Sequence, residues 1–166
     1  GSVSVHPLDD AGVPGERSDL LDLTGQGPDP ERQAGPHAHM VSPDPAGSGV
    51  LITALGSDRV WRARLDPVSG RLVEPAPAIV AAPGTGPRHL YRAADGALLV
   101  AGELAADLTW YRPGAQGLER AGRVPATTLP GTDYPSEVTM GADGRFVYLA
   151  TRGPDTVSVF AWDGGA

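Results

Sequence analysis

The chain has 166 residues, of which 40% are hydrophobic, so a packed core is expected rather than a disordered acidic chain. It contains no cysteine, which excludes disulfide scaffolds, thiolate metal sites and cysteine nucleophiles and suits a cytoplasmic protein. The formal net charge of −7 disfavours nucleic acid and anionic membranes as partners, and no apolar run approaches the roughly 18 residues that span a bilayer.

The first predicted element is an alternating strand at residues 3–8, and a connection follows it up to residue 34. Three similar units come next. In each unit a turn that ends in glycine precedes an apolar run, and a short polar turn then leads to a second strand. The apolar runs are residues 50–54, 97–101 and 145–150, and the second strands are residues 60–65, 108–111 and 157–162.

The units recur at a nearly constant spacing. Their turn glycines, Gly49, Gly96 and Gly144, lie 47 and 48 residues apart. Two of these turns are Asp-Gly pairs, which favour tight hairpins because glycine readily adopts a positive φ. A period of this length, made only of strands and turns, is typical of propeller blades, whereas leucine-rich repeats are shorter and helical repeats need a helical periodicity.

We therefore predict an all-β fold, a partial β-propeller of about three and a half four-stranded blades. Residues 1–34 would be the end of one blade and a connection, residues 35–85 and 86–133 two blade units, and residues 134–166 an incomplete unit. Residues 122–133 are expected to be a long Gly- and Pro-rich connection. Because propellers close with at least about four blades, we expect the chain to start partway through a longer product and to need the missing blades of its parent chain as partners.

Six short motifs follow one another along the chain. They are Gly35-Pro36-His37-Ala38-His39, Leu55-Gly56-Ser57-Asp58-Arg59-Val60, Gly84-Thr85-Gly86-Pro87-Arg88-His89, Gly102-Glu103-Leu104, Pro135-Ser136-Glu137-Val138 and Thr151-Arg152-Gly153. This order resembles the lactonase family of seven-bladed β-propellers, which includes cycloisomerase-type 6-phosphogluconolactonases and fungal carboxymuconate lactonizing enzymes. The resemblance implies seven blades in the intact protein, no cofactor, and a catalytic cluster at the channel mouth. Its members would be His39 (or His37), Arg88, Glu103 and Arg152.

The chain departs from the family pattern around these groups. Ala54 stands where Asp is common, Gly102 and Thr151 stand where Asn is common, and Pro154 replaces a frequent His. The four charged groups are retained, so the departures concern their surroundings and hence the choice of substrate.

Alignment of the units places His39, His89 and Glu137 at equivalent points, each at the start of an inner strand that would line the central channel. We expect His37, His89 and Glu137 to bind substrate there. His37 and His39 would face the same side of a strand, as a metal pair does. No Glu follows them in residues 40–49, so no metal site is predicted.

Glu103 and Arg152 also occupy equivalent places, each five residues before the anchor of the next strand, Leu108 or Val157. A plain repeat does not need opposite charges at one position. A carboxylate held by arginines beside a channel is a candidate acid or base, and the alternative is a salt bridge that joins two blades.

The resemblance implies a hydrolase in the intact parent that acts on a small anionic lactone such as 6-phosphogluconolactone. A cycloisomerase acting on a muconate-like dicarboxylate and a non-catalytic propeller scaffold are the alternatives. We expect residues 1–166 alone to hydrolyse little or no lactone, because a site that lacks its neighbouring blades stays wet and loosely positioned.

Overall fold

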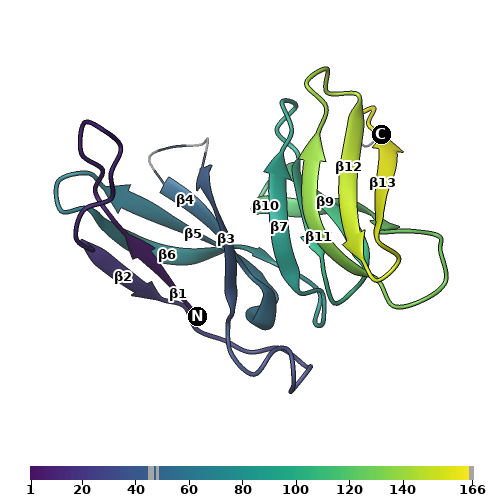
Figure 1. Ribbon diagram of the computed structural model, residues 1–166, viewed down its shortest axis with the longest axis horizontal. Coiled ribbons are helices and arrows are strands. Elements are labelled where there is room, and N and C mark those ends of the chain that lie inside the picture. Colours follow the sequence, from purple (N-terminus) through teal and green to yellow (C-terminus); the bar gives the residue numbers. More distant parts are fainter. Residues whose placement is uncertain (45–46, 48, 165–166) are drawn as a thin grey trace.

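The computed structural model describes residues 1–44, 47 and 49–164, and the polypeptide there forms four antiparallel sheets (Figure 1). A two-stranded sheet contains β1 (Ser2–Val5) and β2 (Asp19–Asp22). The next sheet has four strands in chain order, β3 (Ala38–Asp44), β4 (Gly49–Ala54), β5 (Arg59–Asp66) and β6 (Arg71–Val80). A short 3₁₀ helix, η1 (Leu55–Ser57), lies between β4 and β5.

Two further sheets repeat the same meander. One contains β7 (Pro87–Arg92), β8 (Leu98–Gly102), β9 (Asp107–Gly114) and β10 (Gly117–Pro125). The other contains β11 (Tyr134–Met140), β12 (Phe146–Arg152) and β13 (Thr156–Ala161). The prediction of an all-β partial propeller is confirmed, because sheets of up to four strands in simple up-and-down order succeed one another without closing a ring (Figure 1). The blade limits predicted at residues 34/35, 85/86 and 133/134 stay a proposal.

The first strands of the sheets are neighbours, since β7 packs against both β3 and β11. The core lies between consecutive sheets rather than within one. Cluster members from β4, β5 and β6 pack against β7, β8 and β9, and members from β8 and β9 pack against β11 and β12. Leu51, Leu98 and Leu99 are almost fully buried. Each sheet therefore depends on its neighbour to bury its apolar faces.

The predicted turns and connections can be compared with the structure. Gly96 and Gly144 have φ values of 89° and 70°, so the positive φ expected of the two Asp-Gly turns is confirmed. The turn of the first unit includes residues 45, 46 and 48, which lie outside the described residues. The long connection expected at residues 122–133 is wrong at its start: residues 122–125 belong to β10, which continues past a bulge between Arg120 and Gly122.

Candidate active site

Three β-bulges occur at the same place in three sheets, near the start of each first strand. In each, the pairing of the first strand with the second skips one residue. The skipped residues are His39 in β3, Arg88 in β7 and Ser136 in β11. A bulge leaves its extra residue out of the ladder and redirects its side chain, which is why bulges are frequent beside functional sites.

The bulges correct the alignment of the units. Counted from the sheet register, His39 is equivalent to Arg88 and Ser136, whereas His89 is equivalent to Glu137 and Met40. The predicted equivalence of His39 with His89 and Glu137 is therefore wrong by one residue. The expectation that His37 and His39 share one face of a strand is also wrong, because β3 begins at Ala38 and His37 has a left-handed φ of 48°.

Glu103 is the centre of a cluster of charges. It follows the last residue of β8, and only 1% of its side chain is exposed. Arg88 Nη1 donates to Glu103 Oε2 at 2.6 Å, and Arg152 Nη2 lies 2.9 Å from the same oxygen. The other oxygen, Oε1, accepts from Arg32 Nη2. Side chains from two neighbouring sheets, β7–β10 and β11–β13, and from the connection between β2 and β3 therefore meet at one carboxylate.

Burial alone would raise the pKa of Glu103. Hydrogen bonds from Arg32 and Arg88, with the positive charges of Arg152 and Arg88, outweigh this desolvation and hold the pKa below its usual value. The carboxyl group is therefore ionised at neutral pH. Both of its oxygens are already occupied by guanidinium donors, so Glu103 is better suited to holding arginines in place than to accepting a proton.

His39 joins the cluster through Arg88, whose Nη1 lies 2.7 Å from His39 Nε2. Desolvation of the ring, followed by the charge of Arg88, lowers the pKa of His39. The ring is therefore neutral at pH 7 and can accept a proton, which is the requirement for a general base.

The other predicted site residues, His89, Glu137 and His37, differ in their contacts with this cluster. His89 stands next to it, with its ring 5.9 Å from that of His39. His89 Nδ1 makes an ion-pair contact of 2.6 Å with Glu137 Oε2, at an angle outside the range of a hydrogen bond. His37 precedes β3, and within residues 1–44, 47 and 49–164 no polar contact joins its side chain to the other six.

Two residues of the cluster were missed by sequence reasoning. Arg32 lies in the connection between β2 and β3, outside the repeat. Tyr134 opens β11, and the guanidinium carbons of Arg32 and Arg152 lie 5.8 and 5.7 Å from its ring centre. Arg32 has no counterpart in the other units, and the places equivalent to Tyr134 hold Gly86 and His37, so the period gave no signal for either residue.

The segment that carries Arg32 is fixed by a buried polar network. Gln33 is fully buried, and its Nε2 donates to Leu55 O at 3.0 Å and to Asp58 Oδ1 at 2.9 Å. Asp58 in turn accepts the backbone N–H groups of Gly84 and Gly86, each at 2.8 Å. This network anchors the Arg32 segment and the turn before Arg88 to one carboxylate.

Thr53 links two of the bulges directly. It is fully buried in β4, and its hydroxyl accepts the N–H of Met40 at 3.0 Å and donates to the carbonyl of Arg88 at 2.6 Å. The residue after one bulge and the extra residue of the next are thus joined by a single side chain. This bridge joins the strands that carry His39 and Arg88.

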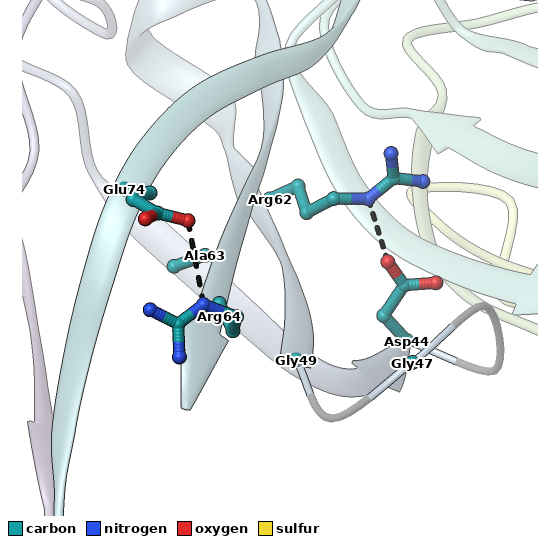
Figure 2. A pocket seen from close by; sticks show the side chains of 7 residues that line it. All are labelled: Asp44, Gly47, Gly49, Arg62, Ala63, Arg64 and Glu74. Atoms are coloured by element: carbon teal, nitrogen blue, oxygen red, sulfur yellow. Dashed lines mark hydrogen bonds and ion pairs between the residues drawn. The ribbon is translucent and has the colours of Figure 1, made fainter. Parts of the chain in front are cut away.

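A pocket of about 360 Å³ lies elsewhere, on the sheet β3–β6 (Figure 2). It contains none of the predicted site residues. Arg62 Nε pairs with Asp44 Oδ2 at 2.6 Å, and Arg64 Nε pairs with Glu74 Oε2 at 3.3 Å (Figure 2). Because the two arginines are paired with two carboxylates, the described lining residues carry no excess of positive charge to attract an anion.

The described residues include neither a metal-binding group nor a membrane-spanning helix. Among the described residues there is no group of three His, Asp or Glu side chains arranged to hold a metal ion. The described part of the chain also includes no helix with the length and hydropathy of a membrane span. The fold and the cluster together define an open β-propeller arc that carries arginines, a carboxylate and a histidine at one end of its sheets.

Comparison with known proteins agrees with this class. The model of the family "Lactonase, 7-bladed beta-propeller" matches residues 1–166, and the chain belongs to that family. The 6-phosphogluconolactonase of Bacillus subtilis (strain 168) is 33% identical over 165 residues, which cover 96% of this chain and 46% of the relative.

Solved structures give the same result. A putative 6-phosphogluconolactonase from Bacteroides fragilis superimposes with a TM-score of 0.85 at 29% identity, over 98% of this chain and 48% of that one. The periplasmic gluconolactonase of Pseudomonas aeruginosa has a TM-score of 0.84 at 27% identity, over 97% of this chain and 46% of that one. The chain thus spans about half the length of these relatives.

Proposed function

We propose that the protein carrying this chain hydrolyses a small anionic lactone such as 6-phosphogluconolactone. The observation that carries the proposal is the cluster of three arginines around a buried Glu103 with a neutral His39 beside them. Lactone hydrolysis needs an activated water, a stabiliser for the oxyanion and an anchor for the substrate's own charge. The cluster contains a group suited to each of these roles.

In this proposal His39 is the base. A substrate oxygen that takes over the Arg88 hydrogen bond frees His39 Nε2, which then accepts a proton as water attacks the lactone carbonyl carbon. The guanidinium of Arg88 stabilises the tetrahedral oxyanion. The bond from the carbonyl carbon to the ring oxygen then breaks, the leaving oxygen takes the proton from His39, and the resulting acid loses its own proton to water.

Glu103 has a different role from that of a base. Its bonds to Arg88, Arg152 and Arg32 fix the guanidinium groups before substrate arrives. Preorganised donors stabilise a developing charge without having to reorient during the reaction. His89 and Glu137, which contact each other beside His39, would border the substrate, and His37 would lie further out.

The proposal is tested by proton-release assays on a polypeptide that contains residues 1–166 together with the blades that complete its ring. Chain 1–166 alone is measured in parallel and is expected to show little or no activity. The substrates are 6-phosphogluconolactone, neutral gluconolactone and a muconate-like dicarboxylate. Hydrolysis of the phosphorylated lactone that loses most of its rate in His39→Gln supports the proposal. Cyclisation of the dicarboxylate alone would favour the cycloisomerase, and no turnover of any substrate would favour the scaffold.

A further inference from the structure

Arg32 and Arg152 form a pair that differs from Arg88. Both guanidinium groups lie against the ring of Tyr134, and they contact different oxygens of Glu103. Their side chains are 41% and 50% exposed, compared with 20% for Arg88. The pair is therefore held in place on one side and reaches solvent on the other.

The way the pair is held leaves hydrogen-bond donors available. A guanidinium group has five N–H donors in one plane, and contact with an aromatic ring uses its face rather than those donors. Within the described part of the chain, the bonds from both arginines to Glu103 use only Nη2. The other donors of each group are available to an anion, and two planar groups of this kind are well suited to the several oxygens of a phosphate.

The local charge favours the same ligand. Three guanidinium groups and one carboxylate, with His39 neutral, leave two positive charges at the cluster. The whole chain has a net charge of −7, so an anion is attracted here by the cluster itself and not by the general field of the protein.

We propose that Arg32 and Arg152, positioned by Tyr134 and Glu103, form a two-arginine clamp for a phosphate monoester of the substrate. His39 and Arg88 would then act on the lactone ring at the other end of the same molecule. This inference rests on the proposed function in that it assigns the two ends of one substrate. It makes the clamp the determinant that distinguishes a phosphorylated lactone from a neutral one.

Binding to chain 1–166 tests the clamp without any need for turnover. Calorimetric titration with inorganic phosphate and with 6-phosphogluconate should show binding that is about 10-fold weaker in Arg32→Gln, the loss of one charged hydrogen-bonding group. Arg32→Lys should recover only part of the affinity, because an ammonium keeps the charge but cannot present a planar pair of donors. Tyr134→Leu should also weaken binding, and its melting curve shows whether it is folded.

Arg145→Gln is the matched control, because Arg145 precedes the opposite end of β12 from Arg152 and pairs with Asp143. Equal affinity in Arg32→Gln and the unmodified chain would overturn the clamp. Equal losses in Arg32→Gln and Arg145→Gln would also overturn it, since they would show binding by general charge.

Kinetics with the ring completed separate the two proposals. If Arg32→Gln impairs 6-phosphogluconolactone and spares neutral gluconolactone, both proposals stand. If it impairs the two lactones equally, the clamp is wrong and the lactonase stands. If neither lactone is hydrolysed while phosphate binding still depends on Arg32, the lactonase is wrong and the anion site stands.

Discussion

Arg88 Nη1 lies 2.7 Å from His39 Nε2, and the two residues are the extra residues of equivalent bulges in neighbouring sheets. A guanidinium group can only donate, so Nε2 of His39 must accept. The proton of the neutral ring is therefore on Nδ1. This contact fixes both the tautomer of His39 and the nitrogen that would act as base.

The state of His39 predicts a pH dependence. Because desolvation and the Arg88 charge lower its pKa below the ordinary 6.5, the ring stays neutral until the pH falls below that value. We expect kcat/KM for an anionic lactone to be constant near pH 7 and to fall at lower pH as His39 becomes protonated. Initial rates from pH 4.5 to 8, corrected for spontaneous hydrolysis, measure this.

Two variants identify the group that titrates. His39→Gln should remove the acidic limb together with most of the activity, and Arg88→Gln should move the residual limb to higher pH, because one cause of the low pKa is removed. An unchanged limb in His39→Gln would show that another group is the base.

Arg88 is predicted to contribute mainly to binding and transition-state stabilisation. Arg88→Ala should lower kcat/KM by roughly 10- to 200-fold, from a charged hydrogen-bond contribution of about 1.5–3 kcal/mol. Arg88→Lys should restore little, because the ammonium has no planar pair of donors. Steady-state kinetics of both variants measure these changes.

The stability of the Arg88 variants separates a catalytic role from a structural one. Glu103 keeps Arg32 and Arg152 when Arg88 is removed, so the melting temperature should fall by only about 2–4 °C, which corresponds to ~1 kcal/mol. A large loss of stability in both variants with little change in kinetics would instead support a salt bridge between blades.

Thr53 is predicted to hold the two bulges together. Thr53→Val keeps the shape of the side chain and removes the hydroxyl, which leaves the Met40 N–H and the Arg88 carbonyl without that partner. The expected loss in the free energy of unfolding is about 1–3 kcal/mol. Urea denaturation measures the stability, and kcat/KM should fall as well because the position of Arg88 is loosened.

Thr151→Val is the control for the same substitution. Thr151 is also buried, but its hydroxyl has no hydrogen-bond partner among the described residues. Thr151→Val should therefore be neutral or slightly stabilising. Similar losses in the two variants would mean that Thr53 contributes packing and not a bridge.

Chain 1–166 is expected to self-associate when expressed alone. Within the described residues β13 is the edge of its sheet, and Val157 and Val159 on it are 60% and 57% exposed. An open edge with exposed valines invites pairing with another strand. Size-exclusion chromatography with light scattering should show dimers or larger species, and Val159→Lys should shift them towards monomer.

Val68→Lys is the control for the lysine introduced by Val159→Lys. Val68 is a turn residue that is 94% exposed and is distant from the edge strand β13 in the sheet order. The control substitution should leave the association unchanged. A sharp monomer at all concentrations for the unmodified chain would contradict the prediction.

The fold could be predicted because three of the four sheets repeat one pattern of apolar runs and turns. Gly96 and Gly144 mark equivalent hairpins, and their spacing defines the blade period before any contact is known. The bulges could not be predicted in this way. One extra residue changes the register of a strand only locally. The sequence alignment therefore matched His39 with His89, one residue after its true equivalent, Arg88.

Only those residues of the candidate site that belong to the six sequence motifs were predicted. Arg32 lies in a connection without a repeat, and its position depends on the buried Gln33 and Asp58, which become partners only when distant segments meet. Tyr134 stands before Pro135 at the start of a strand, where an aromatic residue is more often part of the core. Long-range contacts of this kind leave no periodic trace in the sequence.

In three first strands the bulge residue lies outside the strand pairing, so the residues that hold the blade together are different from the residue whose side chain points out of the ladder. Pairing resumes directly after the extra residue in each first strand, so the ladder does not depend on the chemistry of that one side chain. The three sheets hold a histidine, an arginine and a serine at this position, on nearly the same backbone. The bulge therefore allows each blade to present a different functional group. Ser136, whose hydroxyl donates to the carbonyl of Ala150 and to no other group among the described residues, is the position at which a new functional group could be added without altering His39 or Arg88.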